Sequence, residues 1–170
     1  MFDIILPSPF VLGVKDPEDG RLGCAIEAVF PSLDDYITMV WNEMPIYLSC
    51  RYDVSIVAND IVRIVNELLK GYDVDFQNSW PSNTFYAIWN IVSCGEKVTI
   101  VADWINVFGD EDALNEKNEV AIDKKELIHK LCIILNFVSQ GVDKVGYTTN
   151  ELEDYHNLLD VLIRARGFSN

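Results

Sequence analysis

The chain has 170 residues, of which 49% are apolar, and its 13 Lys and Arg face 27 Asp and Glu, giving a formal net charge of −14. This apolar content excludes a wholly disordered chain, and the excess of carboxylates argues against binding to nucleic acid or to anionic lipid, both of which attract basic surfaces. The sequence contains no run of about eighteen apolar residues, so it predicts no membrane span.

Apolar runs separated by turn residues predict two β-hairpins in the first third of the chain. Residues 10–14 and 22–30 flank the strong turn signal DPEDG and are expected to pair with each other. Residues 36–41 and 46–51 alternate apolar and polar side chains on either side of a short turn, which predicts a second hairpin.

A helix is predicted from Asp53 to about Gly71. Apolar side chains recur at helical spacing along this stretch, the Asp53 side chain is expected to cap the first turn, and Gly71 suits the position after the last turn. Residues 72–83, which carry Trp80 among polar and turn residues, are predicted to form a loop.

The most apolar stretch, residues 85–105, predicts the central hairpin of a sheet. Two β-rich runs, FYAIWNIVS and VTIVADWIN, flank a short turn that contains Gly95. Apolar residues occupy nearly every position of both runs, so we expect both faces of this hairpin to be largely covered.

The last third of the chain predicts helices. Residues 109–119 are expected to form an exposed loop or a short irregular helix. Asp123 with Glu126, and Thr148 with Glu151, have the spacing of capping boxes and predict the starts of two further helices, the first of which should stop near Gly141. The economical interpretation is one α+β domain (1–170), with a mainly antiparallel sheet of about six strands packed against about three helices.

No motif in the sequence supplies catalytic, cofactor-binding or metal-binding chemistry. His129 and His156 have no partner for acid–base or metal chemistry in their sequence neighbourhoods, and the acids at 110–112 lack the rest of a calcium-binding loop. The four widely spaced cysteines contain no CxxC pair, and Asp3 stands where a signal peptide would be basic. We therefore expect a non-catalytic cytoplasmic protein without cofactor or metal.

Carboxylates gather in the sequence on both sides of the predicted central hairpin. Because the arms of a hairpin begin and end at the same end of a sheet, the loops 72–83 and 106–119 are predicted to be neighbours in space. Aromatic rings there would anchor a basic partner protein inside a charged rim. The predicted partner-binding residues are Tyr72, Asp73, Asp75, Trp80, Asp110, Glu111, Asp112, Glu116 and Glu119.

With acid-rich segments GYDVDF and GDEDALNE around an apolar hairpin, the chain resembles the immunity proteins of bacterial polymorphic toxin systems. The resemblance is one of profile: short, acidic, α+β and without a catalytic motif. It implies a protein that neutralises a toxin domain, often a basic nuclease, by covering its active site or another essential surface.

Two other functions are compatible with the same sequence. A mimic of nucleic acid would need its carboxylates aligned in a stripe, an arrangement that depends on the fold. An enzyme or small-ligand protein would assemble its site from dispersed residues, and a deep apolar pocket with convergent polar groups would favour that interpretation.

Overall fold

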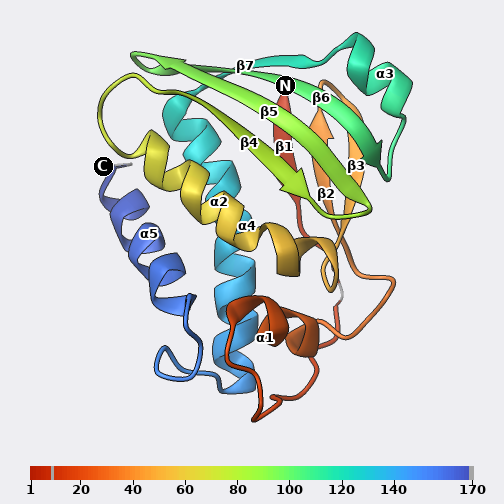
Figure 1. Cartoon of the computed structure of the whole chain (residues 1–170), viewed down its shortest axis with the longest axis vertical. Coiled ribbons are helices and arrows are strands. Elements are labelled where there is room, and N and C mark those ends of the chain that lie inside the picture. Colours follow the sequence, from red (N-terminus) through yellow and green to blue (C-terminus); the bar gives the residue numbers. More distant parts are fainter. Residues whose placement is uncertain (9, 169–170) are drawn as a thin grey trace.

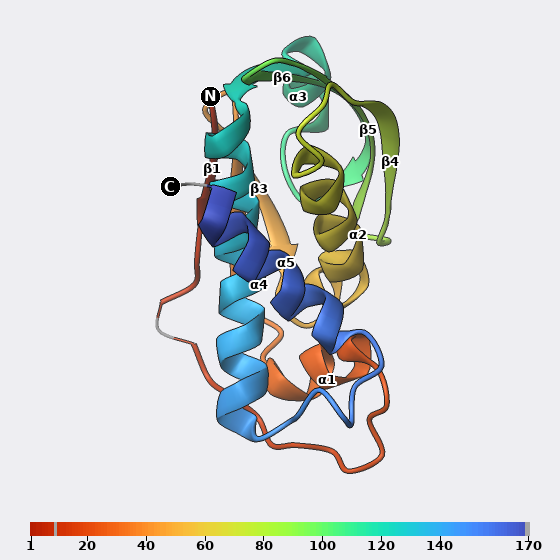
Figure 2. The same ribbon diagram turned by 90° about the vertical axis from the view of Figure 1, so that its left-hand side faces the viewer.

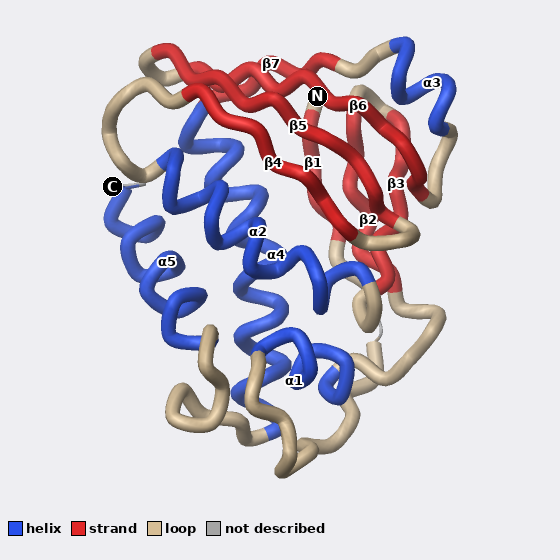
Figure 3. Tube along the Cα trace, in the orientation of Figure 1, coloured by secondary structure: helices blue, strands red, loops and turns tan. Residues whose placement is uncertain are grey.

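The computed structural model describes residues 1–8 and 10–168, and these form seven strands and five helices (Figure 3). In chain order the elements are β1 (Phe2–Ile5), α1 (Leu22–Val29), β2 (Tyr36–Trp41), β3 (Met44–Ser49), α2 (Asp53–Leu68), β4 (Asp75–Pro81), β5 (Phe85–Cys94), β6 (Lys97–Val107), α3 (Glu111–Glu116), β7 (Glu119–Asp123), α4 (Lys124–Val145) and α5 (Tyr155–Phe168). The predicted α+β class is confirmed.

The strands form two antiparallel sheets, with orders β1-β2-β3 and β4-β5-β6-β7. The smaller sheet lies behind the larger one, and α1, α2, α4 and α5 fill the rest of the molecule below them (Figure 1). The prediction of one sheet of about six strands is therefore wrong. The sheets meet through their apolar faces, where the ring of Trp41 packs against Trp89 and Trp104 at centroid distances of 5.3 and 5.0 Å.

The hairpin β5–β6 is the centre of the larger sheet, as predicted. Its turn joins Cys94 to Lys97, and at its other end Phe85 is paired with Val107. We call these the turn end and the base end of the hairpin. Every second side chain, including Trp89, is buried against the smaller sheet and the helices.

The outer face of this hairpin is uncovered, which corrects the prediction that both faces would be buried. Tyr86, Val92 and Ile105 are exposed there, and among the described residues no helix lies on that side of β4 and β5 (Figure 2). These apolar residues suit a strand because branched and aromatic side chains favour extended backbone even on a solvated face.

The segment predicted as the loop 72–83 contains the edge strand β4. Phe76, Asn78 and Trp80 point inward along it, and Trp80 is only 1% exposed. Its ring packs 4.9 Å from Trp89, so pairing with β5 turns a polar sequence into a strand that buries its tryptophan.

The predicted first hairpin is absent from the described residues, because Leu22–Val29 is the helix α1 and residues 10–14 form no strand. The buried residues of α1 are Leu22, Ala25, Ile26 and Val29, which share one helical face and pack against α2 and α4. The burial of this apolar face favours a helix and outweighs the preceding turn signal, which had predicted a hairpin.

The three predicted helices are present as α2, α4 and α5, with different ends. The Asp123 carboxylate caps α4 as predicted, but α4 continues past Gly141 to Val145. A Cβ at Gly141 would lie 2.7 Å from the ring of Phe30, so this glycine serves close packing rather than helix termination. The helix α5 begins at Tyr155, later than its predicted capping box.

Candidate protein-binding surface

The two groups of carboxylates predicted to share one surface lie at opposite ends of the β5–β6 hairpin. The Asp73 carboxylate accepts a hydrogen bond from the Gly95 backbone N–H at 2.8 Å, at the turn end. Asp110 caps α3, which follows the base end and packs beside β6 (Figure 1). The two segments contact each other at the base end, where the Asn106 side chain donates to the Asn83 carbonyl at 2.8 Å. The predicted adjacency is wrong for the acids because β4 runs the length of the sheet between them.

Most of the predicted partner-binding side chains are nevertheless accessible. Tyr72, Asp73, Asp75, Asp110, Asp112, Glu116 and Glu119 are exposed, and Glu111 is half-buried. Trp80 lies in the core and cannot contact a partner. The acidic segment 109–119 contains the helix α3, whose first turn is capped by the Asp110 carboxylate accepting from the Ala113 N–H at 3.1 Å. Of the two predicted conformations, a loop or a short helix, the helix is therefore correct.

The base end carries a group of aromatic side chains that the sequence analysis missed. They surround a cavity of about 270 Å³, which we call the aromatic cup and which is lined by Leu33, Tyr36, Tyr47, Ser49, Tyr52, Asp53, Thr84 and Phe108. The ring of Phe108 lies 5.7 Å from that of Tyr36 and 5.3 Å from that of Tyr47. Phe108 is 55% exposed and Tyr52 48% exposed, so the rim of the cup offers large rings to solvent.

The aromatic cup forms where the ends of the two sheets meet. The Tyr47 backbone N–H, on β3, donates to the Phe108 carbonyl just after β6, at 2.9 Å. A Cβ on the next residue, Gly109, would lie 2.9 Å from the Pro45 carbonyl oxygen, so glycine is needed for the two segments to approach this closely. The contact between the sheets thus brings rings from distant parts of the chain together.

Asp53, the first residue of α2, forms the floor of the aromatic cup. It is 1% exposed, and its carboxylate accepts hydrogen bonds from the Ser49 backbone N–H at 2.7 Å and from the hydroxyls of Thr84, at 2.6 Å, and Ser82. The predicted capping of α2 by this side chain is wrong, because the carboxylate instead joins β3 and α2 to the β4–β5 connection. All three donors are neutral, so these hydrogen bonds bring no positive charge to the carboxylate, which lies at the amino end of α2.

Several residues that line the aromatic cup have acidic neighbours in the chain. Asp34 and Asp35 precede Tyr36 in the chain, and Asp110 follows Phe108 by two residues. Burial, together with the nearby charges of Asp35 and Asp53, raises the pKa of the Cys50 thiol to about 12. Carboxylates therefore act on a buried thiol that follows Ser49, a residue of the cup lining, in the chain.

The accessible surface continues from the aromatic cup to the uncovered face of the larger sheet. A second cavity of about 310 Å³ is lined by Ser79, Pro81, Ser82, Asn83, Tyr86 and Asn106. The short segment 82–84 lies between the two cavities, since Thr84 lines one and Ser82 the other. A partner seated at the base end would thus meet rings, carboxylates and amides on adjoining surfaces.

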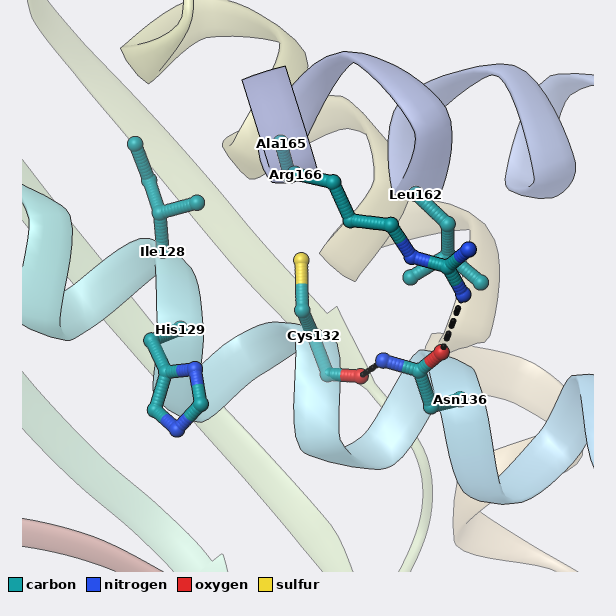
Figure 4. Close-up of a pocket in the computed structure, with 7 residues that line it drawn as sticks. All are labelled: Ile128, His129, Cys132, Asn136, Leu162, Ala165 and Arg166. Atoms are coloured by element: carbon teal, nitrogen blue, oxygen red, sulfur yellow. Dashed lines mark hydrogen bonds between the residues drawn. The ribbon is translucent and has the colours of Figure 1, made fainter. Parts of the chain in front are cut away.

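A separate cavity of about 220 Å³ lies between α4 and α5 (Figure 4). Its Cys132 thiol points away from the ring of His129, and burial raises the pKa of this thiol to about 11. Asn136 donates to the Cys132 carbonyl at 2.8 Å and accepts from Arg166 at 3.5 Å. The thiol therefore stays protonated at neutral pH and is not paired with a base.

Within residues 1–8 and 10–168, no three His, Cys, Asp or Glu side chains are grouped so that they could hold a metal ion. In the same part of the chain, no helix has the length and apolarity to cross a membrane. No protein-family model, curated protein or solved structure matches the chain. The function proposed below therefore rests on the surface of the molecule.

Proposed function

We propose that this protein is a non-catalytic binding protein for a basic protein, and most concretely a cytoplasmic immunity protein that neutralises a nuclease-type toxin domain. The aromatic cup carries the proposal. Its rings include Tyr36 and Phe108, which lie two residues from Asp34 and Asp110 in the sequence, on a chain whose net charge is −14. Large rings at a cavity, with charges around them, have the composition of a protein-binding hot spot.

The rings and the carboxylates have different tasks in such an interface. Exposed acids attract a basic partner over distances of about 8 Å at physiological salt and so raise the association rate. Aromatic rings that lose contact with water on docking slow dissociation, because their apolar surface has to be rehydrated. Phe108 and Tyr52, each about half exposed, have area left to bury.

The chemistry of the cup supports binding rather than catalysis. Its lining contains no histidine, lysine or cysteine, and both oxygens of Asp53 already accept hydrogen bonds. A hydrolytic site needs a nucleophile or activated water beside a free base. The Asp53 carboxylate instead holds the walls of the cup in place.

The same cavity favours a second candidate function, the binding of a small ligand. It combines apolar rings with a few convergent polar groups, the feature expected of such a protein. Its volume of about 270 Å³ lies below the range of roughly 300–1,000 Å³ typical of pockets for drug-sized molecules. A ligand held there alone would be small.

Affinity capture from the host, with the protein immobilised and the retained proteins identified by mass spectrometry, tests the proposed function. We expect a basic protein that is released as salt is raised, and whose toxicity, when it is expressed alone, is relieved by co-expression of this chain. A retained protein that is acidic, or a toxic partner whose effect co-expression leaves unchanged, would contradict the proposal.

A further inference from the structure

The walls of the aromatic cup are largely aromatic, a composition that can attract a positive charge. Tyr36, Tyr47 and Phe108 lie within 6.4 Å of one another by ring centroid, and Tyr52 adds a fourth ring to the lining. Cations are attracted to the faces of aromatic rings within about 6 Å, and more strongly where water is excluded. Several rings around one cavity therefore favour a cationic occupant over an anionic one.

The floor of the cup adds a buried negative charge. Among the described residues, no lysine, arginine or histidine lies within ion-pair distance of Asp53, whose hydrogen-bond donors are a backbone N–H and two hydroxyls. A buried carboxylate with only neutral partners gains from a nearby cation, because the interior screens charge weakly. The rings and the Asp53 carboxylate therefore both favour a cation in the cup.

The basic residue nearest in sequence does not fill the cavity. Arg51 is absent from the cup lining, and its guanidinium donates to the Pro31 carbonyl at 3.3 Å. It lies 5.3 Å from the centre of the Tyr52 ring, so a ring of the rim already carries one guanidinium. The cavity itself remains open to a cation from outside the chain.

We propose that the aromatic cup receives the cationic end of one lysine or arginine side chain of the basic partner, an inference that rests on the proposed function. A cavity of about 270 Å³ suits one side chain, and the net charge of −14 on the chain is opposite to that of the surface that would carry it. The docked cation is held by ring faces and by the Asp53 charge together. This contact fixes the orientation of the partner on the base end.

Amino-acid probes test the cup without the partner. N-acetyl-lysine methylamide and N-acetyl-arginine methylamide are titrated into the full chain, with their neutral counterparts made from norleucine and citrulline, and ring resonances are followed by NMR. We expect saturable shifts of Tyr36, Tyr47 and Phe108 with the cationic probes, at affinities several-fold above the neutral ones, and no shift of Tyr72. Equal responses to charged and neutral probes, or no saturable response, overturn the inference.

A pair of matched variants separates the rings from the fold. Phe108→Leu keeps an apolar side chain but removes a ring of the cup, and should weaken binding of the cationic probes roughly two- to thirty-fold. Tyr72→Leu removes an exposed ring at the turn end and should leave it unchanged. Circular dichroism of both variants shows whether the fold is intact, and equal loss in the two variants contradicts a site at the cup.

The two proposals fail in different ways. If a basic partner is captured but binds wild type and Phe108→Leu with equal affinity, the cup is not its binding site. The inference then fails, but the proposed function stands. If the cup binds the cationic probes but the captured partner presents no lysine or arginine there in a cross-linked complex, the cup is a site for a small free cation. That outcome also overturns the inference.

Discussion

The base end and the turn end of the β5–β6 hairpin both carry exposed carboxylates, but only the base end surrounds a cavity with aromatic rings. At the turn end Tyr72 is 60% exposed, and no ring–ring contact involves it among the described residues. The nearby Asp73 carboxylate is bonded to the Gly95 N–H and so stabilises the turn. At the base end Phe108 meets two other rings above a buried carboxylate.

The comparison teaches that negative charge does not by itself mark a binding surface on this molecule. Acids are spread along most of the chain, where their charge favours solubility and would attract a basic partner without orienting it. Orientation needs apolar area that is accessible before docking and buried afterwards. We therefore place the proposed partner at the base end, where negative charge and accessible apolar area occur together.

The largest contrast between the two ends concerns their cysteines. Cys50 is buried behind the cup with its pKa raised to about 12, whereas Cys94 at the turn end is exposed. At pH 8 a thiol of that pKa is ionised in only about one molecule in 10⁴. Iodoacetamide labelling followed by peptide mass spectrometry should modify Cys94 readily and Cys50 only after unfolding. Labelling of Cys50 in the native protein at the rate of Cys94 would mean that the cup region opens.

The second contrast compares two carboxylates that each accept a backbone N–H. Asp53→Ala leaves the Ser49 N–H and the hydroxyls of Ser82 and Thr84 without their acceptor, so it should lower the free energy of unfolding by about 2–4 kcal/mol. Asp73→Ala, at the exposed turn end, should change it little. Chemical denaturation measures the free energy of unfolding of both variants. Similar midpoints for the two would show that Asp53 does not stabilise the base end.

The third contrast concerns affinity for the captured partner. Phe108→Ala removes a half-exposed ring from the cup and should weaken binding by about 2 kcal/mol, or roughly thirty-fold, through faster dissociation. Tyr72→Ala is its matched control. Surface plasmon resonance resolves the two rate constants. A loss confined to Tyr72→Ala would move the binding surface to the turn end.

The smallest expected effect is electrostatic. Changing Asp110, Glu111 and Asp112 together to Asn, Gln and Asn keeps an acceptor at the cap of α3 and removes three charges beside the cup. Association should slow by up to about ten-fold at low salt, and its salt dependence should flatten, with dissociation nearly unchanged. The control is Asp73→Asn with Asp75→Asn. Equal slowing in both would show that the acids act through net charge and not through position.

The sequence predicted the elements whose signals are local. The hairpin β5–β6 follows from two β-rich runs around Gly95, and the start of α4 follows from the Asp123 cap. The helix α1 was missed although its buried residues have helical spacing, because no side chain caps it and a turn signal precedes it. β4 was missed because Asn, Ser and Pro are typical of loops, and pairing with β5 outweighs that preference.

The aromatic cup could not be predicted, because its residues come from separate segments that no local pattern connects. Tyr36 and Tyr47 belong to the smaller sheet, and Phe108 follows β6 of the larger sheet. The hydrogen bond from the Tyr47 N–H to the Phe108 carbonyl depends on how the sheets pack. The available signal was weak: Tyr36 and Phe108 each lie beside acids and turn residues. Aromatic residues in such positions are the ones to examine first once a fold is known.

The burial of all four tryptophans has an optical consequence. Trp41, Trp80, Trp89 and Trp104 form one cluster with neighbouring ring centroids 4.9–6.1 Å apart, while the cup is lined by tyrosine and phenylalanine. Coupling between such close indoles gives a near-ultraviolet dichroic signal that disappears when side-chain packing is lost. The indole signal therefore reports the integrity of the core and is insensitive to what docks at the rim. One spectrum distinguishes a variant that has unfolded from a variant that has only lost its partner.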